Sequence, residues 1–187
     1  MIPWLPLSFD PLPVWIAAAV TAMLFAHAAL AKAGDLPLLE QHLAVYGVPP
    51  VLLPAATRLL PALEGLVAVL LLTPLRTPGA VLAAVLLLAY GAAMGVHRWH
   101  GHALDCGCGG EPLPVSWALV ARNGVLAAVA AVAAAPVAAR PMGYADFAVV
   151  AAAVTLATLL YAAFNQLLRH HGGLHARPSL RRTSWTH

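Results

Sequence analysis

The two cysteines of this chain are the residues best suited to do chemistry. Cys106 and Cys108 are the only cysteines among 187 residues, and a single glycine separates them. They lie in a polar, glycine-rich connection, Asp105 to Gly110, between long apolar runs. Two thiols this close in sequence indicate either a redox pair or part of a metal site.

The redox interpretation needs only these two thiols. A thiolate at one cysteine attacks a disulfide, and the second cysteine resolves the mixed intermediate. A Cys-Gly-Cys disulfide closes a very small ring, and strained disulfides are more readily reduced. Such a pair would pass oxidation on to another protein rather than hold a fold together.

The metal interpretation adds the histidines that precede the cysteines. Three histidines and two cysteines fall within a short stretch and could bind a soft or borderline metal. The Cys-x-Cys spacing differs from that of zinc sites, whose cysteines are usually separated by two to four residues. The alternative metal site comprises His97, His100, His102, Cys106 and Cys108.

A few polar residues interrupt the apolar runs and are candidates for function, because charge in hydrocarbon is costly. Glu64 has apolar sequence on both sides, and its expected partners are Lys32 and Arg122. A Glu64 ion pair could fix the helix register, or it could take part in proton transfer or in holding a ligand. Arg122, which precedes Asn123, could lie under the cysteine loop and favour a thiolate, or extend to lipid headgroups.

The elements that must position these residues are membrane-spanning helices. Hydrophobic residues make up 61% of the chain and charged residues 9%, with a mean hydropathy of +0.82. A soluble domain carries about 25% charged residues, so this chain has too few charged residues to cover a surface that faces water. Each lipid-spanning segment should be a helix, since it must satisfy its own backbone hydrogen bonds. We therefore expect a single all-α domain over residues 1–187, a helical bundle with five spans near 14–33, 57–75, 79–96, 115–139 and 144–168.

The connections between the spans are expected to be short, with one exception. The stretch from Gly34 to Ala56 has Leu36, Leu39 and Leu43 at helical spacing, which fits a short helix at the membrane interface. The turns at residues 73–79 and 140–143 carry prolines and glycines. We expect no nucleic-acid partner, since no folded basic surface accompanies the four arginines of the polar tail at 169–187, namely Arg169, Arg177, Arg181 and Arg182.

The side of the membrane that the cysteines face is predicted differently by two rules. Basic loops and tails favour the cytoplasm. A cytoplasmic basic tail after five spans would put the cysteine loop in the cytoplasm too, and Lys32, Arg58 and Arg98 favour the same side. Persistent disulfides, however, usually belong to oxidising compartments.

Three motifs of this chain resemble those of the MauE family, within the wider DoxX-like group. The first is the small-residue run from Phe25 to Lys32, and the second is Arg58-x-x-Pro61-x-x-Glu64. The third is the block from Asp105 to Gly110, with Ser116-Trp117 and Arg122-Asn123 after it. The likeness extends from about Ala18 to Ala135, and one departure is Gly109, where the family usually has phenylalanine.

The resemblance implies a redox-associated protein of the bacterial cytoplasmic membrane. MauE-like proteins are associated with maturation of the disulfide-rich small subunit of methylamine dehydrogenase, alongside a thioredoxin-like partner, MauD. Carried over by motif, Cys106 and Cys108 would be the redox pair. The supporting polar residues would be Lys32, Arg58, Glu64, Asp105, Arg122 and Asn123.

The function expected from the sequence is thiol–disulfide exchange that supports maturation of an exported protein. The expected partners are membrane lipids, a thioredoxin-like protein and the exported client. A non-catalytic assembly scaffold and a metal-binding membrane protein are the alternatives. Replacing both cysteines with serine distinguishes thiol–disulfide exchange from a non-catalytic scaffold.

Overall fold

The computed structural model describes residues 9–100 and 115–175, and this part of the chain is helical almost throughout. Its helices are α1 (Pro11–Gly34), α2 (Leu36–Val45), α3 (Leu53–Leu71), α4 (Arg76–Trp99), α5 (Trp117–Ala133) and α6 (Tyr144–His175). The expected all-α membrane bundle is confirmed. By length and composition, four of the described helices can cross a membrane: α1, α3, α4 and α6.

The remaining apolar helix, α5, is shorter than the sequence predicted. It was expected over residues 115–139, but it ends at Ala133. Its 17 residues would extend about 26 Å, somewhat less than the roughly 30 Å of a bilayer core. Pro136 follows three residues later and cannot continue a helix, which accounts for the early end.

Helix α3 is displaced toward the N-terminus from its expected bounds of 57–75. It begins at Leu53 because Pro54, in the first turn, suits the start of a helix. Helix α3 ends at Leu71 and α4 begins at Arg76. Residues 76–79 of the turn expected at 73–79 are therefore helical. The expected short helix at the interface is present as α2, and Gly47, with a φ of 89°, lies in the turn that follows it.

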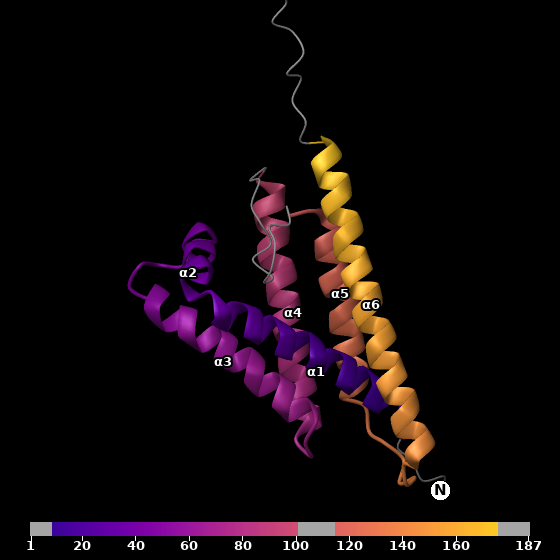
Figure 1. The fold of residues 1–187 in the computed structure, drawn as a ribbon. Helices are drawn as coiled ribbons and strands as arrows, with labels where there is room; N and C mark the ends of the chain where they lie inside the picture. Colours follow the sequence, from indigo (N-terminus) through magenta and orange to yellow (C-terminus); the bar gives the residue numbers. More distant parts are fainter. Residues whose placement is uncertain (1–8, 101–114, 176–187) are drawn as a thin grey trace, which may run out of the picture.

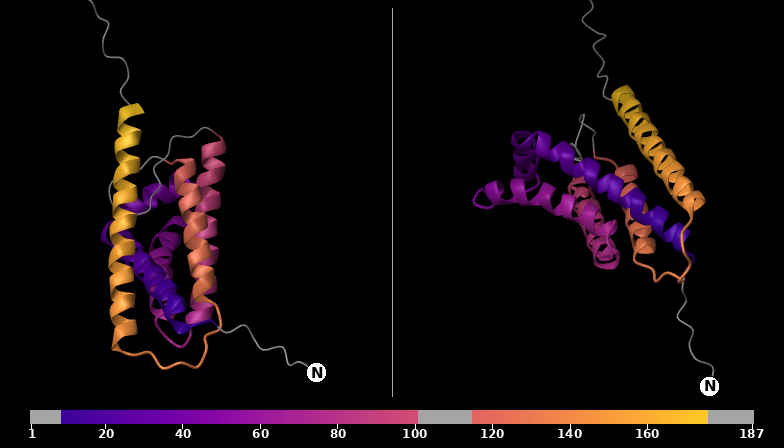
Figure 2. Two further views of the ribbon diagram at one scale, coloured as in Figure 1. Left: turned by 90° about the vertical axis from the view of Figure 1, so that its right-hand side faces the viewer. Right: turned by 60° about the horizontal axis from the view of Figure 1, so that its bottom comes forward.

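The helices alternate in direction, so their ends gather at two opposite ends of the bundle (Figure 1). The start of α1 and the start of α6 lie at one end. The last residues of α4 and α6 lie at the other, where α2 also lies. Helix α1 crosses the upright helices obliquely and packs against both α3 and α5, as the turned views in Figure 2 also show.

The core between these helices consists largely of alanine. Ala18 of α1, Ala80 and Ala83 of α4, and Ala130 of α5 are completely buried. Small side chains let membrane helices approach closely, which compensates for the absence of a hydrophobic drive between helices in lipid. Among the described glycines, the closest contact is at Gly79, where a Cβ would lie 2.8 Å from the Cβ of Leu70 across the α3–α4 turn.

Helix α6 differs from the others because none of the residues in its span is buried. It packs against α1, and it also meets α5 through the contacts of Arg122 described below. At its N-terminal end, Arg140 joins Asp146 of α6 to Asp10, which caps α1.

Candidate functional site: a buried polar cluster beside a membrane-embedded cavity

The Lys32–Glu64 ion pair is at the centre of the site. The Nζ of Lys32 lies 2.6 Å from Oε1 and 2.9 Å from Oε2 of Glu64. Glu64 is completely buried and Lys32 is 7% exposed. Of the two cations expected to partner Glu64, the structure therefore places Lys32 against it.

The positions of both side chains follow from local sequence. Lys32 is in the last turn of α1, where a cation is favoured by the helix dipole. On α3, Thr57, Pro61 and Glu64 recur every three or four residues and are all buried, so they share one face. Arg58 falls off this face and is exposed, so the Arg-x-x-Pro-x-x-Glu motif brings only its last two members to the core.

Tyr90 is a third member that the sequence analysis missed. Its hydroxyl donates a hydrogen bond of 2.7 Å to Oε1 of Glu64, and its ring centroid lies 5.5 Å from Nζ of Lys32. A tyrosine within an apolar span could have signalled this role, since a buried tyrosine hydroxyl usually has a hydrogen-bond partner. Glu64 thus accepts three hydrogen bonds from two donor groups, which offset much of the cost of its burial.

A second set of polar contacts joins α5 to α6, and beside it α5 packs closely on α4. The Nη1 of Arg122 donates to Oδ1 of Asn165 at 2.7 Å, and the guanidinium lies 5.2 Å from the ring centroid of Tyr161. Asn123 is buried, and its Nδ2 donates to the backbone oxygen of Leu119. Beside it on α4, a Cβ added to Gly91 would lie 3.4 Å from the Cβ of Asn123.

A cavity of about 320 Å³ connects these two sets of residues. Lys32, Glu64 and Tyr90 line one part of it, and Arg122 and Tyr161 line another. Helix α2 contributes part of the wall through Leu39, His42 and Leu43, and Tyr46 directly after the helix adds to it. The short interfacial helix therefore covers the cavity, with Leu39 buried while Glu40 and Gln41 face outward.

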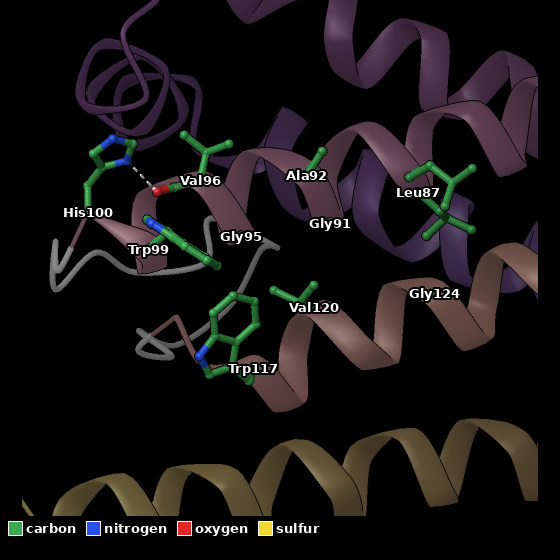
Figure 3. A pocket seen from close by; sticks show the side chains of 11 residues that line it. Leu87, Gly91, Ala92, Gly95, Val96, Trp99, His100, Trp117, Val120 and Gly124 are labelled. Carbon is green, nitrogen blue, oxygen red and sulfur yellow. Dashed lines mark hydrogen bonds between the residues drawn. The ribbon is translucent and has the colours of Figure 1, made fainter.

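A second, more open hollow of about 460 Å³ lies between α4 and α5 (Figure 3). Its lining is almost entirely apolar, and Trp99 and Trp117 both face it. These two tryptophans are largely exposed at one end of the bundle, as in the aromatic belts of membrane proteins. His100, at the edge of this hollow, lies with its Nδ1 2.8 Å from the backbone oxygen of Val96.

The cysteine segment lies outside the described residues. Asp105, Cys106 and Cys108 fall within 101–114, as does His102 of the alternative metal site. The other two histidines of this alternative site, His97 and His100, are at the end of α4. The rings of His97 and Tyr46 meet edge to face, with their centroids 4.9 Å apart. Within residues 9–100 and 115–175, no group of three or more His, Cys, Asp or Glu side chains could hold a metal ion.

Arg76 is a buried cation that the sequence analysis assigned to a turn. Its guanidinium donates to the backbone oxygens of Ala133 at 2.6 Å and Ala135 at 3.1 Å, and lies 5.7 Å from the ring centroid of Trp15. The last carbonyls of a helix lack partners within that helix. Arg76 therefore caps α5, at the end of the bundle where α6 begins.

Fold and site together define a class: a multi-pass helical membrane protein with a buried ion pair beside a cavity. The family model described as "Methylamine utilisation protein MauE" matches residues 10–136. The chain belongs to this family.

Two relatives extend the match over nearly the whole chain. The methylamine utilization protein MauE of Paracoccus denitrificans is 38% identical over 184 residues, which cover 94% of this chain and 95% of the relative. The protein of the same name from Paracoccus versutus is 40% identical over 176 residues, which cover 90% and 91%. No solved structure shows significant similarity to this chain.

Proposed function

We propose that this protein acts in methylamine utilisation as a thiol–disulfide exchange protein of the bacterial cytoplasmic membrane. Cys106 and Cys108 form the redox pair. The pair supports the maturation of an exported, disulfide-containing protein such as the small subunit of methylamine dehydrogenase. A thioredoxin-like protein is the direct partner.

The observation that carries the proposal is the isolated Cys-Gly-Cys motif in a chain of this family. The sequence holds no other cysteine, so neither thiol has a different partner within the chain. Exchange proceeds when a thiolate of the partner attacks the Cys106–Cys108 disulfide and the partner's second thiolate displaces this chain's sulfur. One disulfide forms in the partner, and this chain gains two thiols.

The buried cluster supports this function indirectly. Lys32 and Glu64 join the end of α1 to α3, and Tyr90 adds α4. These contacts hold the half of α4 that leads toward His100, the last described residue before the cysteine segment. In α5, which begins soon after that segment, Arg122 is held by its hydrogen bond to Asn165 of α6, and Asn123 is bonded within α5 to Leu119.

Mixed-disulfide trapping in cells that contain the partner tests the proposal. One cysteine of the pair forms the bond to the partner, and the other can release it. With the releasing cysteine changed to serine, the bonding cysteine should stay joined to the partner as a reducible band of higher mass. The complementary single variant should give no such band. The double variant Cys106→Ser/Cys108→Ser is the control for non-specific bonding.

Two outcomes would contradict the proposal. One is the absence of any trapped species in both single variants. The other is undiminished client maturation in cells that carry the double serine variant. Undiminished maturation would favour the non-catalytic scaffold, because a scaffold does not need the thiols.

A further inference from the structure

The cavity beside Glu64 has the make-up of a ligand-binding site. Its volume of about 320 Å³ is within the range of small-molecule sites, which are mostly apolar with a few convergent polar groups. Phe25, Leu60, Leu87 and Leu126 supply apolar walls. The polar groups converge from four helices, through Lys32, Glu64, Tyr90 and Arg122.

The position of the cavity selects ligands that dissolve in the bilayer. It lies among helices long and apolar enough to span the membrane, and Ala93 of α4, one of its lining residues, is exposed. A molecule that reaches Ala93 comes from the lipid phase. It must be apolar enough to partition there and still carry groups for the polar side of the cavity.

The polar side of the cavity is rich in donors. Lysine and arginine carry only N–H donors, and the hydroxyl of tyrosine can donate as well. The single hydrogen of the Tyr90 hydroxyl is donated to Glu64. Lys32 and Arg122 are therefore the donors that suit a ligand whose polar atoms are acceptors, such as carbonyl oxygens. The rings of Phe25 and Tyr161 add aromatic surface, against which a flat ring packs well.

We propose that this cavity binds the ring of a membrane-dissolved quinone. A quinone has a flat ring, two carbonyl acceptors and an apolar tail that can remain in lipid. The choice of a quinone over other lipophilic carbonyl compounds rests on the proposed thiol–disulfide function. A thiol pair that oxidises a client repeatedly must lose two electrons in each cycle, and a quinone accepts two.

The reaction balances without a further reactant. Two cysteine thiols lose two protons and two electrons, and one sulfur–sulfur bond forms. The quinone gains two electrons and two protons, and its two carbonyl groups become hydroxyls. The Lys32–Glu64–Tyr90 cluster contributes hydrogen-bonding groups that can accept and return protons at the ring oxygens.

Two neighbouring alanines of α4 provide a matched test. Ala93 lines this cavity, whereas Ala92 lines the hollow between α4 and α5 (Figure 3). Both are exposed, so phenylalanine at either position adds the same side chain without entering the core. Only Ala93→Phe should fill the proposed quinone site.

The full chain would be placed in nanodiscs of quinone-free lipid and titrated with a short-chain ubiquinone, with empty nanodiscs to correct for partitioning. We expect saturable binding to the native protein and to Ala92→Phe. Ala93→Phe should weaken binding at least about tenfold. Absence of saturable binding, or equal binding to both variants, would overturn the proposal.

A cysteine-free chain separates this proposal from the proposed function. The Cys106→Ser/Cys108→Ser variant should bind the quinone as the native protein does, because the described residues that line the cavity are unchanged. It should form no quinol, whereas the reduced native protein should form one quinol for each disulfide. If the native protein binds quinone without forming quinol, the cavity assignment stands and the redox function of the cysteines fails.

Discussion

Glu64 accepts hydrogen bonds at both carboxylate oxygens, and the donors come from two other helices. A completely buried carboxylate is tolerable only when it is paired and hydrogen-bonded. The three residues therefore act as a unit that fixes the relative positions of α1, α3 and α4. Any function of one member must be judged against this structural role.

Removing one charge should harm the protein more than removing both. Lys32→Met leaves Glu64 buried beside the neutral Tyr90, which should cost up to about 3–5 kcal/mol. Lys32→Met/Glu64→Gln removes both charges and keeps an acceptor for the hydroxyl of Tyr90. We expect its thermal unfolding midpoint in detergent to exceed that of the single variant. A double variant less stable than Lys32→Met would contradict this account of the cluster.

The sequence predicted some of these residues but not others, for physical reasons. A lone carboxylate in an apolar span demands a cation, so an ion pair of Glu64 with Lys32 or Arg122 could be predicted, but only the structure shows that the partner is Lys32. A tyrosine hydroxyl makes no such demand, because its ring also suits an apolar core, and Tyr90 was missed. Arg76 was missed because its partners are backbone carbonyls at the end of α5, which no residue type reveals.

At the scale of the elements, composition predicted the existence of the helices better than their bounds. Apolar composition does not show where backbone hydrogen bonding stops within an apolar run. The expected fourth span continued through alanine and valine to residue 139, but Pro136 ended α5 early. Similarly, Pro54 moved the start of α3 into the expected connection. In both cases the proline was a better guide than the hydrophobicity.

Two of the glycines in α4, Gly79 and Gly95, should change the stability of the protein in opposite directions when they are replaced by alanine. A Cβ at Gly79 would lie 2.8 Å from the Cβ of Leu70 and 3.1 Å from backbone atoms of Leu70 and Leu71. Gly79→Ala should therefore separate α3 from α4 and lower the thermal unfolding midpoint. Nothing lies within 4 Å of a Cβ at Gly95. Gly95→Ala should leave the packing intact and stabilise α4 by about 0.5–1 kcal/mol through helix propensity.

Measured side by side in the same detergent, these two substitutions test the helix packing directly. The chemical change is identical and both positions are in α4, so propensity cancels in the comparison. Equal effects on the unfolding midpoint would mean that α3 and α4 do not approach as closely at Gly79 as the structure shows.

At the scale of the whole molecule, the exposed Arg58 lies near the start of α3 and the exposed Arg98 near the end of α4, and these two helices run in opposite directions (Figure 1). At the opposite end, Arg76 donates hydrogen bonds to backbone oxygens. Arg140, just before α6, forms ion pairs with two carboxylates. The positive-inside rule would assign the end with Arg58 and Arg98 to the cytoplasm. Direct exchange with an exported client requires the cysteine segment to face the side of the membrane away from the cytoplasm.

Labelling intact cells with a membrane-impermeant maleimide tests which side of the membrane the two cysteines face. The proposed function predicts that Cys106 and Cys108 are labelled after mild reduction. Cells permeabilised before labelling give the total signal, and the Cys106→Ser/Cys108→Ser variant gives the background. Labelling that appears only after permeabilisation would contradict direct exchange with an exported client.

Arg140 ties the first and last helices together at one end of the molecule. Its Nε lies 3.0 Å from Oδ2 of Asp10, and its Nη1 lies 3.0 Å from Oδ2 of Asp146. The hydrogen bond from Arg140, followed by that from the backbone N–H of Leu12, lowers the pKa of the Asp10 carboxyl below its ordinary value of 3.8. The folded protein thus holds this proton less tightly than the unfolded chain does.

The sign of the pH dependence follows from that difference. Because the pKa of Asp10 is lower in the folded state, its contribution to stability is complete above pH 3.8. It is lost as the pH falls through the folded-state pKa. Arg140→Gln should therefore lower the unfolding midpoint at neutral pH, and the gap from the native protein should narrow on acidification below about pH 4. Asp10→Asn should show the same narrowing. A gap that stays constant down to about pH 2, or widens, would mean that the contact does not link α1 to α6 in the folded protein.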